Sequence, residues 1–516
     1  NGDIDIIEYS SRYCQMDCEV LKQGYVKFKE WIGLICGLNI DNYVSLPQLA
    51  NDYLKKEKVY DKVYMVSGVV REFCYGAMVG GRTMLRNNEM YDTNEFEDRF
   101  KGVLLNDLDA VSLYASAMIR LGGFCKGVAK VIPDLDWCVL KDLDLYIVEI
   151  QIFNIPKKYP FSLLSKKGEN GVRCFDDKVD YDEYVTIDKI ALEDLINFCE
   201  MKPDIDFKVI RGYYWNKGRN NRLGVVIQHL VDVRKEQKAL GNPIQLVYKL
   251  LSNSAYGKTL LKPIEYDTTY LNAPPVDDNG DPLEFTEFAD RFKNKGTTDK
   301  LNNYVMKNYN EIYNITPLPN KRDFKIKKYK AIDTHYNSCH CGIEVLSMSK
   351  RIMNEVLCLA HNIGVMVYYQ DTDSMHIEND KIPLLEKAFY DKYNRELVGT
   401  DVGQFHCDFD SKICKGNLVS IRSIGLGKKC YIDVLKGDKS GDAIDYHIRM
   451  KGISLDAILY YCEQNKINPE QLYEKLYDGE EITFDLLCGG SRVNFEFMDN
   501  MEVRSKMDFT RRIKFN

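Results

Sequence analysis

Two aspartates at the tip of a predicted β-hairpin constrain the fold of this chain more than any other feature. The hairpin runs from Val365 to Glu378 (VMVYYQDTDSMHIE), and its tip holds Asp371 and Asp373. Apolar residues alternate with other positions on both sides of the tip: Val365, Val367, Tyr369, Met375 and Ile377. Two carboxylates this close repel each other unless a positive charge lies between them, and oxygen ligands suit magnesium. The pattern indicates a divalent-metal site or, alternatively, a polar turn that happens to hold two aspartates.

A third carboxylate ends another predicted strand. Residues Val103 to Asp109 alternate so that Asp107 and Asp109 share one face. If this strand lies beside the hairpin, Asp109 meets Asp371 and Asp373, and such a cluster can hold two metal ions. Two metals can activate a hydroxyl nucleophile and stabilise the leaving oxygen of a phosphoryl transfer. We expect Asp107 to be a supporting or solvated acid rather than a ligand.

Two predicted helices form a hairpin that carries basic residues. Leu223 to Leu240 has a helical period, Gly241-Asn242-Pro243 breaks it, and a second helix is predicted from Ile244 to Leu260. Residues spaced to share one face carry the polar groups: Arg234 and Lys238 on the first helix, and Lys249, Asn253 and Tyr256 on the second. An antiparallel pairing could aim the cations at one anion, such as a triphosphate. A solvated basic face is the alternative.

The composition is that of an ordinary globular protein. The chain has 516 residues, enough for about three or four domains. Its net charge of −7 argues weakly against nucleic acid as a partner, but a local basic channel would be sufficient. The apolar stretches are too short to cross a bilayer, so no membrane partner is expected. Sixteen cysteines without a repeating spacing, and no signal peptide, indicate reduced thiols of an intracellular, non-secreted protein.

Three motifs, in chain order, resemble those of family B DNA polymerases. Asp109-Ala-Val-Ser-Leu-Tyr-Ala-Ser116 resembles motif A (D-x-x-S-L-Y-P-S), and Lys249-Leu-Leu-Ser-Asn-Ser-Ala-Tyr-Gly257 resembles motif B (K-x-x-x-N-S-x-Y-G). Tyr369-Gln-Asp-Thr-Asp-Ser374 resembles motif C (Y-x-D-T-D-S). Lys429-Cys-Tyr431 is similar to the K-x-Y motif at the entry to the family's thumb domain.

The resemblance implies a role for each matching residue. Asp109 and Asp373 would ligate two Mg²⁺ ions, with Asp371 close by and Mn²⁺ as a substitute metal. Tyr114 would lie under the incoming sugar and exclude a 2′-hydroxyl. The other residues are assigned by motif position: Lys249, Arg234 and Lys238 to the triphosphate, Asn253 and Tyr256 to the nascent base pair, and Lys429 and Tyr431 to the primer strand.

The chain departs from the family pattern in two motifs. Ala115 replaces the usual proline of motif A, but the neighbouring Ser-Leu-Tyr is intact. Gly80-Gly81 resembles the Y-x-G-G element that contacts the template, yet Met78 stands where the aromatic residue belongs. The template contact therefore depends on a substitute such as Tyr75.

Only part of a proofreading domain is expected. Tyr13-x-x-x-Asp17 resembles the family's third exonuclease motif, whereas the first two motifs, which supply the other metal carboxylates, are missing. The segment is then the C-terminal remnant of that domain, because Asp17 alone cannot hold a metal pair. A plain helical aspartate is the alternative.

The resemblance implies an α/β (α+β) fold shaped as a right hand, with palm, fingers and thumb. The expected divisions follow the motifs: 1–75 exonuclease remnant, 76–130 first palm part, 131–217 first insertion, 218–262 fingers, 263–335 second insertion, 336–425 second palm part, and 426–516 thumb. Residues 131–217 are named the first block below, and residues 263–335 the second block.

The two blocks exceed what palm and fingers require. Protein-primed members of the family, from viruses and mobile elements, carry two such insertions, which contact the terminal protein and encircle the DNA. The second block, expected to be irregular, ends in the basic run Lys321 to Lys330 with Phe324 and Tyr329 interleaved. Such a run suits a phosphate-tracking surface or a solvated charge cluster. The implied partners are primer-template DNA, deoxynucleoside triphosphates and a terminal protein, in the host cytoplasm or nucleus.

The sequence therefore predicts template-directed DNA synthesis, with protein-primed replication of a viral or mobile-element genome as the specific form. An RNA- or DNA-primed polymerase with unrelated insertions is the first alternative. A catalytically inactive DNA-binding pseudo-polymerase is the second, and the intact carboxylates and Lys249 argue against it. An RNA-templated or RNA-making enzyme is the third, and Tyr114 argues for deoxyribonucleotides instead.

Overall fold

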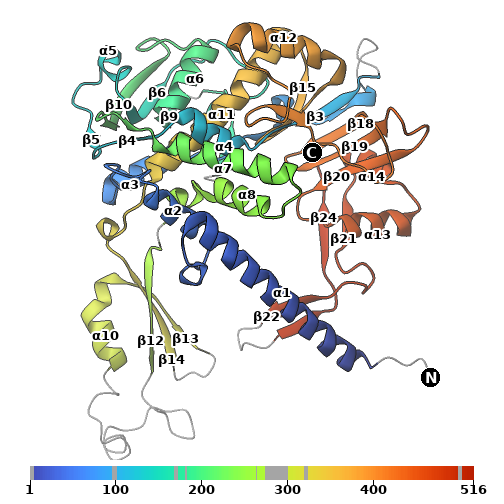
Figure 1. Ribbon diagram of the computed structural model, residues 1–516, viewed down its shortest axis with the longest axis horizontal. Helices are drawn as coiled ribbons and strands as arrows, with labels where there is room; N and C mark the ends of the chain where they lie inside the picture. Colours follow the sequence, from blue (N-terminus) through green and yellow to red (C-terminus); the bar gives the residue numbers. More distant parts are fainter. Residues whose placement is uncertain are drawn as a thin grey trace, which may run out of the picture.

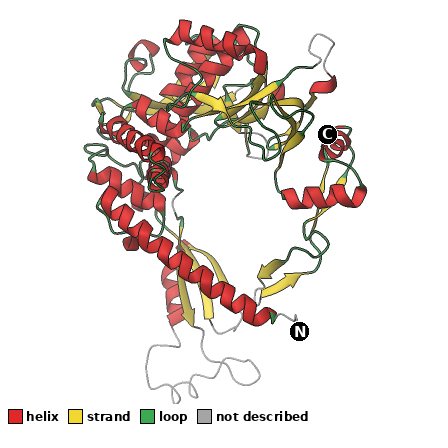
Figure 2. Ribbon diagram, turned by 45° about the vertical axis from the view of Figure 1, so that its right-hand side comes forward, coloured by secondary structure: helices red, strands yellow, loops and turns green. Residues whose placement is uncertain are grey.

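The computed structural model describes residues 5–95, 102–167, 172–179, 183–262, 264–272, 300–318, 323–497 and 503–515. A large sheet lies in the main body, and helix α1 (Ile6–Cys36), the second block and the C-terminal strands extend from it (Figure 1, Figure 2). Lys321 and Arg322 of the predicted basic run lie outside the described residues. No helix in the described ranges is both long and apolar enough to cross a bilayer.

The central sheet contains nine strands, and the predicted hairpin is part of it. Its order is β1-β15-β16-β3-β18-β19-β20, with β17 paired to β3 and β2 paired to β18. The strands are β1 (Thr83–Leu85), β2 (Tyr91–Asp92), β3 (Leu105–Ala110), β15 (Val367–Asp371), β16 (Ser374–Glu378), β17 (Phe405–Cys407), β18 (Leu418–Gly427), β19 (Cys430–Gly437) and β20 (Ile444–Met450). The expected division at residue 425 falls inside β18. The predicted neighbourhood of the hairpin and the strand with Asp109 is confirmed, because β16 pairs with β3.

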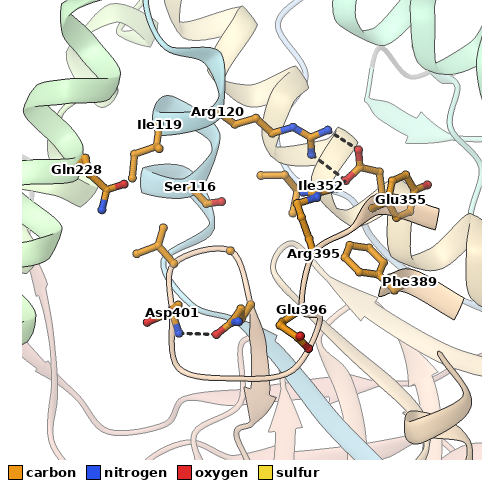
Figure 3. Close-up of a pocket in the computed structure, with 14 residues that line it drawn as sticks. Ser116, Ile119, Arg120, Gln228, Ile352, Glu355, Phe389, Arg395, Glu396 and Asp401 are labelled. Atoms are coloured by element: carbon orange, nitrogen blue, oxygen red, sulfur yellow. Dashed lines mark hydrogen bonds and ion pairs between the residues drawn. The ribbon is translucent and has the colours of Figure 1, made fainter. Parts of the chain in front are cut away.

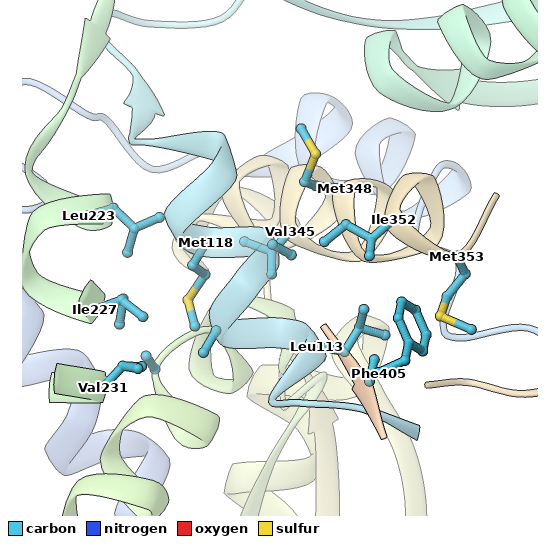
Figure 4. Close-up of a cluster of buried hydrophobic side chains, with 14 of the residues drawn as sticks. Leu113, Met118, Leu223, Ile227, Val231, Val345, Met348, Ile352, Met353 and Phe405 are labelled. Atoms are coloured by element: carbon cyan, nitrogen blue, oxygen red, sulfur yellow. The ribbon is translucent and has the colours of Figure 1, made fainter. Parts of the chain in front are cut away.

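Three helices pack against one another beside this sheet. They are α4 (Leu113–Leu121), α7 (Arg222–Ala239) and α11 (Cys339–Asn362). Figure 4 shows their shared core, in which Met118 and Val345 are fully buried. Each fully buried apolar side chain contributes about 1.5–3 kcal/mol relative to an exposed one. This packing holds α7 against α4, the helix that follows β3.

The predicted helical hairpin is present, but its second helix is shorter than predicted. Helix α8 spans Gln245–Ser254 and is followed by a short 3-10 helix, Gly257–Leu260. The Thr259 hydroxyl donates a hydrogen bond to the carbonyl of Tyr256 at 2.5 Å. Such a side-chain bond competes with helical pairing, and glycine is a weak helix former, so the α-helix ends before motif B does.

The N-terminal segment is helical. Helix α1 begins where the Asp5 carboxylate accepts hydrogen bonds from the backbone N–H groups of Ile7 and Glu8, and it ends at Gly37 with φ +59°. Two further helices follow, α2 (Leu46–Lys56) and α3 (Gly68–Gly76). Most of α1 is exposed along its first five turns.

The first block forms its own sheet, of order β5-β10-β6-β9, with a separate hydrophobic core. Its elements are β5 (Lys130–Val131), α5 (Trp137–Leu140), β6 (Leu145–Ile152), β7 (Ser165–Lys167), β8 (Arg173–Phe175), β9 (Glu183–Asp188), α6 (Lys189–Cys199) and β10 (Phe207–Trp215). Two short strands at its edges, β4 (Phe124–Cys125) and β11 (Arg219–Asn220), pair with each other. Polar contacts join α6 to α11, including an ion pair of Arg351 with Asp194 at 2.5 Å.

The prediction that the second block is irregular is wrong. Three antiparallel strands, in the order β12-β14-β13, form a projecting arm with one helix (Figure 1). The elements are β12 (Tyr266–Asn272), α10 (Lys300–Asn308), β13 (Ile312–Pro317) and β14 (Asp323–Tyr329). Apolar alternation is weak in β12 because polar residues lie on both faces: Asp267 and Thr269 are on the face that α10 contacts, and Thr268 is on the other.

The C-terminal part packs on the far end of the central sheet. It contains α13 (Leu455–Asn465), α14 (Pro469–Tyr477), β21 (Ile482–Asp485), β22 (Asn494–Phe497), β23 (Val503–Lys506) and β24 (Thr510–Ile513). Helices α13 and α14 form a hydrophobic core with β18, β19 and β20. Helix α12 (Ile382–Tyr393) lies between β16 and β17 in the chain.

Candidate active site

The β15–β16 turn is aligned with the end of β3 by backbone pairing. Ser374 lies opposite Asp109 in the register, and the Ala110 N–H donates to the carbonyl of Asp373 at 2.8 Å. Thr372, between the two aspartates, has φ +62°, a conformation that β-branched residues rarely adopt. Such strain persists only where neighbours enforce it and is common at functional sites.

Gly81 lets a second backbone segment approach this turn. A Cβ atom at Gly81 would lie 2.4 to 2.9 Å from the side chain of Thr372. The next residue, Arg82, accepts a hydrogen bond from the Thr372 N–H through its carbonyl at 2.7 Å. The predicted Gly80-Gly81 element therefore lies directly against the turn, and Gly80 itself is exposed.

Asp109 and Asp373 form an electrostatically coupled pair. Burial, followed by the charges of Asp373, Asp408 and Asp107, raises the pKa of Asp109 to about 7. Burial also raises the pKa of Asp373 above its usual value. The positive charge of Lys249 lowers the pKa of Asp109, so this lysine is close enough to the site to act on it electrostatically. A cation held between the two carboxylates would relieve their repulsion.

Asp371 lies close enough to Asp373 for its charge to raise the pKa of that residue, but it is also bound by a cation and a hydroxyl. Both of its oxygens accept from Lys429 Nζ at 2.7 Å, and Oδ1 accepts from the Thr83 hydroxyl at 2.9 Å. In the described part of the chain, no group of three or more His, Cys, Asp or Glu side chains is arranged to hold a metal ion. Beside Asp109 and Asp373, Asp371 is thus held in an ion pair with Lys429, and the metal-binding role of the three acids stays a prediction.

Two further acids lie close to this pair. Asp107 is buried, and burial raises its pKa to about 6, so the solvated alternative is wrong for it. Its Oδ1 lies 3.8 Å from His376 Nε2. Asp408 follows β17 and was not predicted, although its charge raises the pKa of Asp109. No motif marks Asp408, and only the pairing of β17 with β3 brings it here.

Helices α7 and α8 face the site with several polar groups. Arg234 Nη1 donates to the Ser112 hydroxyl of motif A at 3.2 Å, and burial lowers the pKa of Arg234. Its Nε is buried and has no hydrogen-bond partner among the described residues. Lys238, Lys249 and Asn253 are exposed, so their side chains are accessible to a ligand. Lys235, which was not predicted, pairs with Asp401 at 2.5 Å instead.

Tyr114 of motif A and Tyr256 of motif B stack on each other. Their ring centroids are 4.6 Å apart, with an interplanar angle of 23°. Burial raises the pKa of both phenols, and the charge of Asp373 adds to each shift. The two rings therefore form one aromatic wall close to the carboxylate pair.

Tyr431 lies beneath the hairpin rather than on an open surface. Its side chain is buried, and its ring centroid is 4.8 Å from that of Tyr369 and 4.9 Å from that of His376. This placement favours support of β15 and β16 over direct contact with a primer strand. Lys429 has φ +59° and is held by its ion pair with Asp371.

Tyr13 and Asp17 are exposed on α1, a helix that extends from the main body (Figure 1). Among the described residues, Asp17 belongs to no group of three or more His, Cys, Asp or Glu side chains that could hold a metal ion. Their helical placement agrees with the predicted remnant, and their role stays a prediction.

A separate cavity of about 640 Å³ lies beside α4. Figure 3 shows Arg120 and Arg395 beside Glu355, whose carboxylate accepts from both guanidinium groups. These two cations lower the pKa of Glu355 despite its burial. None of the predicted site residues lines this cavity, so it is distinct from the carboxylate pair.

Comparisons with known proteins agree with the family that the three motifs indicate. A sequence profile of the family described as DNA polymerase type B, organellar and viral, matches residues 1–356. Phi29 DNA polymerase, complexed with primer-template DNA and incoming nucleotide substrates, is similar in structure with a TM-score of 0.57 and 16% identity, over 99% of this chain and 73% of that chain. Its post-translocation complex with primer-template DNA has a TM-score of 0.54 and 15% identity, with the same coverage of both chains. No curated protein matches the sequence significantly.

Proposed function

The chain belongs to the type B DNA polymerases of the organellar and viral kind, and we propose that it adds deoxyribonucleotides to a primer hydroxyl under the direction of a DNA template. The similarity in fold to Phi29 DNA polymerase confirms the predicted right-hand architecture. The central sheet is then the palm, the α7–α8 hairpin is the fingers, and the C-terminal part is the thumb.

The carboxylate pair Asp109–Asp373 carries this proposal. Two partly buried acids with raised pKa values, with Lys249 and Arg234 on the facing helices, suit a magnesium triphosphate. The oxygen-only donor set fits Mg²⁺, with Mn²⁺ as a substitute. Two bound ions would supply hydroxyl activation and neutralisation of the leaving phosphate. Asp109 and Asp373 would hold them, while Asp371 keeps the turn in place through Lys429 and Thr83.

The residues around the pair would position the nucleotide. Arg234, fixed by Ser112 and lacking a partner on Nε, would donate to a phosphate, as would Lys249 and, at the helix end, Lys238. The stacked Tyr114 and Tyr256 form the wall against which the sugar would rest, leaving no room for a 2′-hydroxyl. Asn253, exposed one turn before Tyr256, would face the nascent base pair.

A primer-extension assay tests the reaction. The intact chain should extend a labelled DNA primer on a DNA template with Mg²⁺ and deoxynucleoside triphosphates, and Asp373→Asn should abolish addition while primer-template affinity survives. Asp410→Asn, which removes an exposed acid in the same region, is the matched control. Absence of addition with Mg²⁺ or Mn²⁺ on every primer would favour the pseudo-polymerase alternative.

We further propose that initiation uses a protein hydroxyl. The support is the presence of two structured blocks outside palm and fingers, one anchored on α11 and one projecting as an arm. An RNA- or DNA-primed enzyme with unrelated insertions remains the alternative. The first block would face the bulky priming protein, and the arm would border the DNA.

The open face of the arm is suited to DNA. Cross-strand pairs set Tyr266 opposite Tyr329, Thr268 opposite Lys327 and Tyr270 opposite Lys325. Helix α10 lies against the other face, where Tyr304 contacts Thr269 at 3.2 Å. Lysines attract phosphates, and tyrosine rings can stack on bases whatever the sequence.

The priming proposal is tested by covalent labelling. The intact chain, a candidate terminal protein and a labelled deoxynucleotide are incubated with Mg²⁺ and separated under denaturing conditions. Labelled terminal protein is expected, and deletion of residues 268–318 should reduce it more than it reduces DNA-primed extension. An intact enzyme that extends DNA primers but labels no candidate protein contradicts protein priming and leaves the polymerase assignment intact.

A further inference from the structure

Arg82 is a buried arginine beside the Asp371–Asp373 turn that no sequence motif marks. Its side chain is 1% exposed. Its three hydrogen bonds within the described residues all go to neutral oxygen atoms. Burial lowers the pKa of Arg82 to about 10, and Asp177 and Asp194 compensate only in part. A buried cation with neutral partners is costly, so an apolar side chain would serve packing better.

The guanidinium joins three separate parts of the fold. Nε donates to Gln370 Oε1 at 2.5 Å, Nη2 donates to Asn354 Oδ1 at 2.8 Å, and Nη1 donates to the Ser162 carbonyl at 2.9 Å. Gln370 is the residue before Asp371 on β15, Asn354 is on α11, and Ser162 belongs to the first block. Because the guanidinium is a rigid planar fork, it fixes these partners at set angles, which a lysine or methionine cannot do.

The backbone around Arg82 touches the turn as well. The Thr372 N–H donates to the Arg82 carbonyl at 2.7 Å, and the Thr83 hydroxyl donates to Asp371 Oδ1 at 2.9 Å. Thr372 has the strained φ of +62°. Arg82 thus contacts the strained turn through its main chain and the preceding strand residue through its side chain.

The contacts continue beyond Arg82 into the first block. Asn354 Nδ2 donates to Asp194 Oδ2 at 2.8 Å, and Arg351 Nε donates to Asp194 Oδ1 at 2.5 Å. Asp194 is buried on α6. A continuous chain of hydrogen bonds therefore runs from α6 through Asn354 and Arg82 to the strand that carries Asp371.

We propose that Arg82 is a positioning residue for the polymerase reaction: it holds the Asp371-Thr372-Asp373 turn in its working geometry and ties it to the first block. The inference rests on the proposed function. Arg82 does not touch the reacting atoms, so it acts through the carboxylates of the turn. Partners that orient metal-binding carboxylates are typically worth about 10- to 100-fold in metal affinity or activity.

The test compares Arg82→Met, Arg82→Lys and Gln370→Leu with Arg86→Met as the control. Arg86 is half-buried and donates to the Val367 carbonyl of the same strand at 3.3 Å, but it contacts neither Gln370 nor the turn. Two quantities are measured: Mn²⁺ affinity by electron paramagnetic resonance, and kcat and KM for single-nucleotide addition. Primer-template affinity and thermal unfolding are recorded alongside them.

For Arg82→Met we expect kcat about 10- to 100-fold lower and Mn²⁺ affinity about 10-fold weaker, with KM for the nucleotide changed less than about threefold. Arg82→Lys should recover part of both losses. The effect of combining Arg82→Met with Gln370→Leu should be smaller than the product of the single effects, because both remove the same contact. Arg86→Met should match the parent chain in kcat and Mn²⁺ affinity.

The proposal is overturned if folded Arg82→Met matches Arg86→Met in kcat and in Mn²⁺ affinity. It is also overturned if the combined variant loses as much kcat as the product of the Arg82→Met and Gln370→Leu losses. If Arg82→Met does not fold, Gln370→Leu and Arg82→Lys decide by the same criteria. If the parent chain adds no nucleotide, the proposed function fails, and the Mn²⁺ comparison still decides whether Arg82 positions the turn.

Discussion

Replacing Asp109 by Asn should make the metal-free protein more stable at alkaline pH while abolishing nucleotide addition. Asp109 lies partly buried beside Asp373, with Asp408 and Asp107 nearby, and Lys249 opposes their combined charge. The folded state therefore resists ionisation of Asp109. An asparagine keeps the shape of the side chain and cannot ionise, so it removes this repulsion together with the metal ligand.

The magnitude follows from the pKa of Asp109, which rises from 3.8 to about 7 on folding. At about 1.4 kcal/mol per pH unit, the ionised form is disfavoured by about 4 kcal/mol at most. Because the carboxylate is partly exposed, solvent screening reduces this to about 1–2 kcal/mol.

The pH dependence has a definite sign. Below pH 3.8 the folded and unfolded states both hold the proton, and Asp109 does not weaken the fold. As the pH rises towards about 7, the unfolded state loses its proton first, so the stability of the parent chain falls, and the loss is complete above that pH. The advantage of Asp109→Asn should therefore grow across this window.

Urea unfolding in EDTA at about pH 4.5 and pH 8 measures the effect, with Asp410→Asn as a control for general charge removal. Mg²⁺ added at about 100 times its dissociation constant should then stabilise the parent chain by about 2.7 kcal/mol and the variant by much less. A variant that is less stable than the parent at pH 8 in EDTA, or equally stabilised by Mg²⁺, would refute the coupled-carboxylate reasoning.

Three further predictions concern the surroundings of the pair. Tyr114→Val should lower the preference for deoxy- over ribonucleotides, measured as the ratio of kcat/KM values, whereas Tyr114→Phe should keep it; equal ratios for parent and Val variant would remove Tyr114 as the gate. Lys249→Ala should reduce kcat/KM for the nucleotide by about 10- to 100-fold with little change in primer-template affinity, and Lys258→Ala on the exposed turn after α8 is the control. A loss of primer-template affinity with unchanged nucleotide kinetics would assign Lys249 to DNA. Replacing Lys325 and Lys327 together by Ala should weaken DNA binding and reduce the salt dependence (the slope of log K on log salt) by about 2; an unchanged slope would exclude the arm from phosphate contact.

The second block shows why a local sequence pattern can fail to predict β-strands. Strand β12 carries polar residues on both faces, with Asp267 and Thr269 on the covered one, so the alternation of apolar and polar residues that marks a half-buried strand is weak. The strands form because β14 pairs on both sides, with β12 and β13, and because Ile326 is buried on the face that α10 contacts through Tyr304. Such pairing joins residues from distant parts of the chain and cannot be read from one segment.

The sequence by itself was sufficient to predict the β15–β16 hairpin, the α7–α8 hairpin and the elements that carry Asp109, Tyr114 and Lys249. Each of these features depends on residues that lie close together along the chain. Only the tertiary structure decided which charges meet. Lys429 pairs with Asp371 across 58 positions, Asp408 reaches Asp109 through β17, and Arg82 becomes a buried link between distant segments. Ionic and hydrogen-bonding partners are chosen by long-range packing and by the removal of water, and neither is encoded in local spacing.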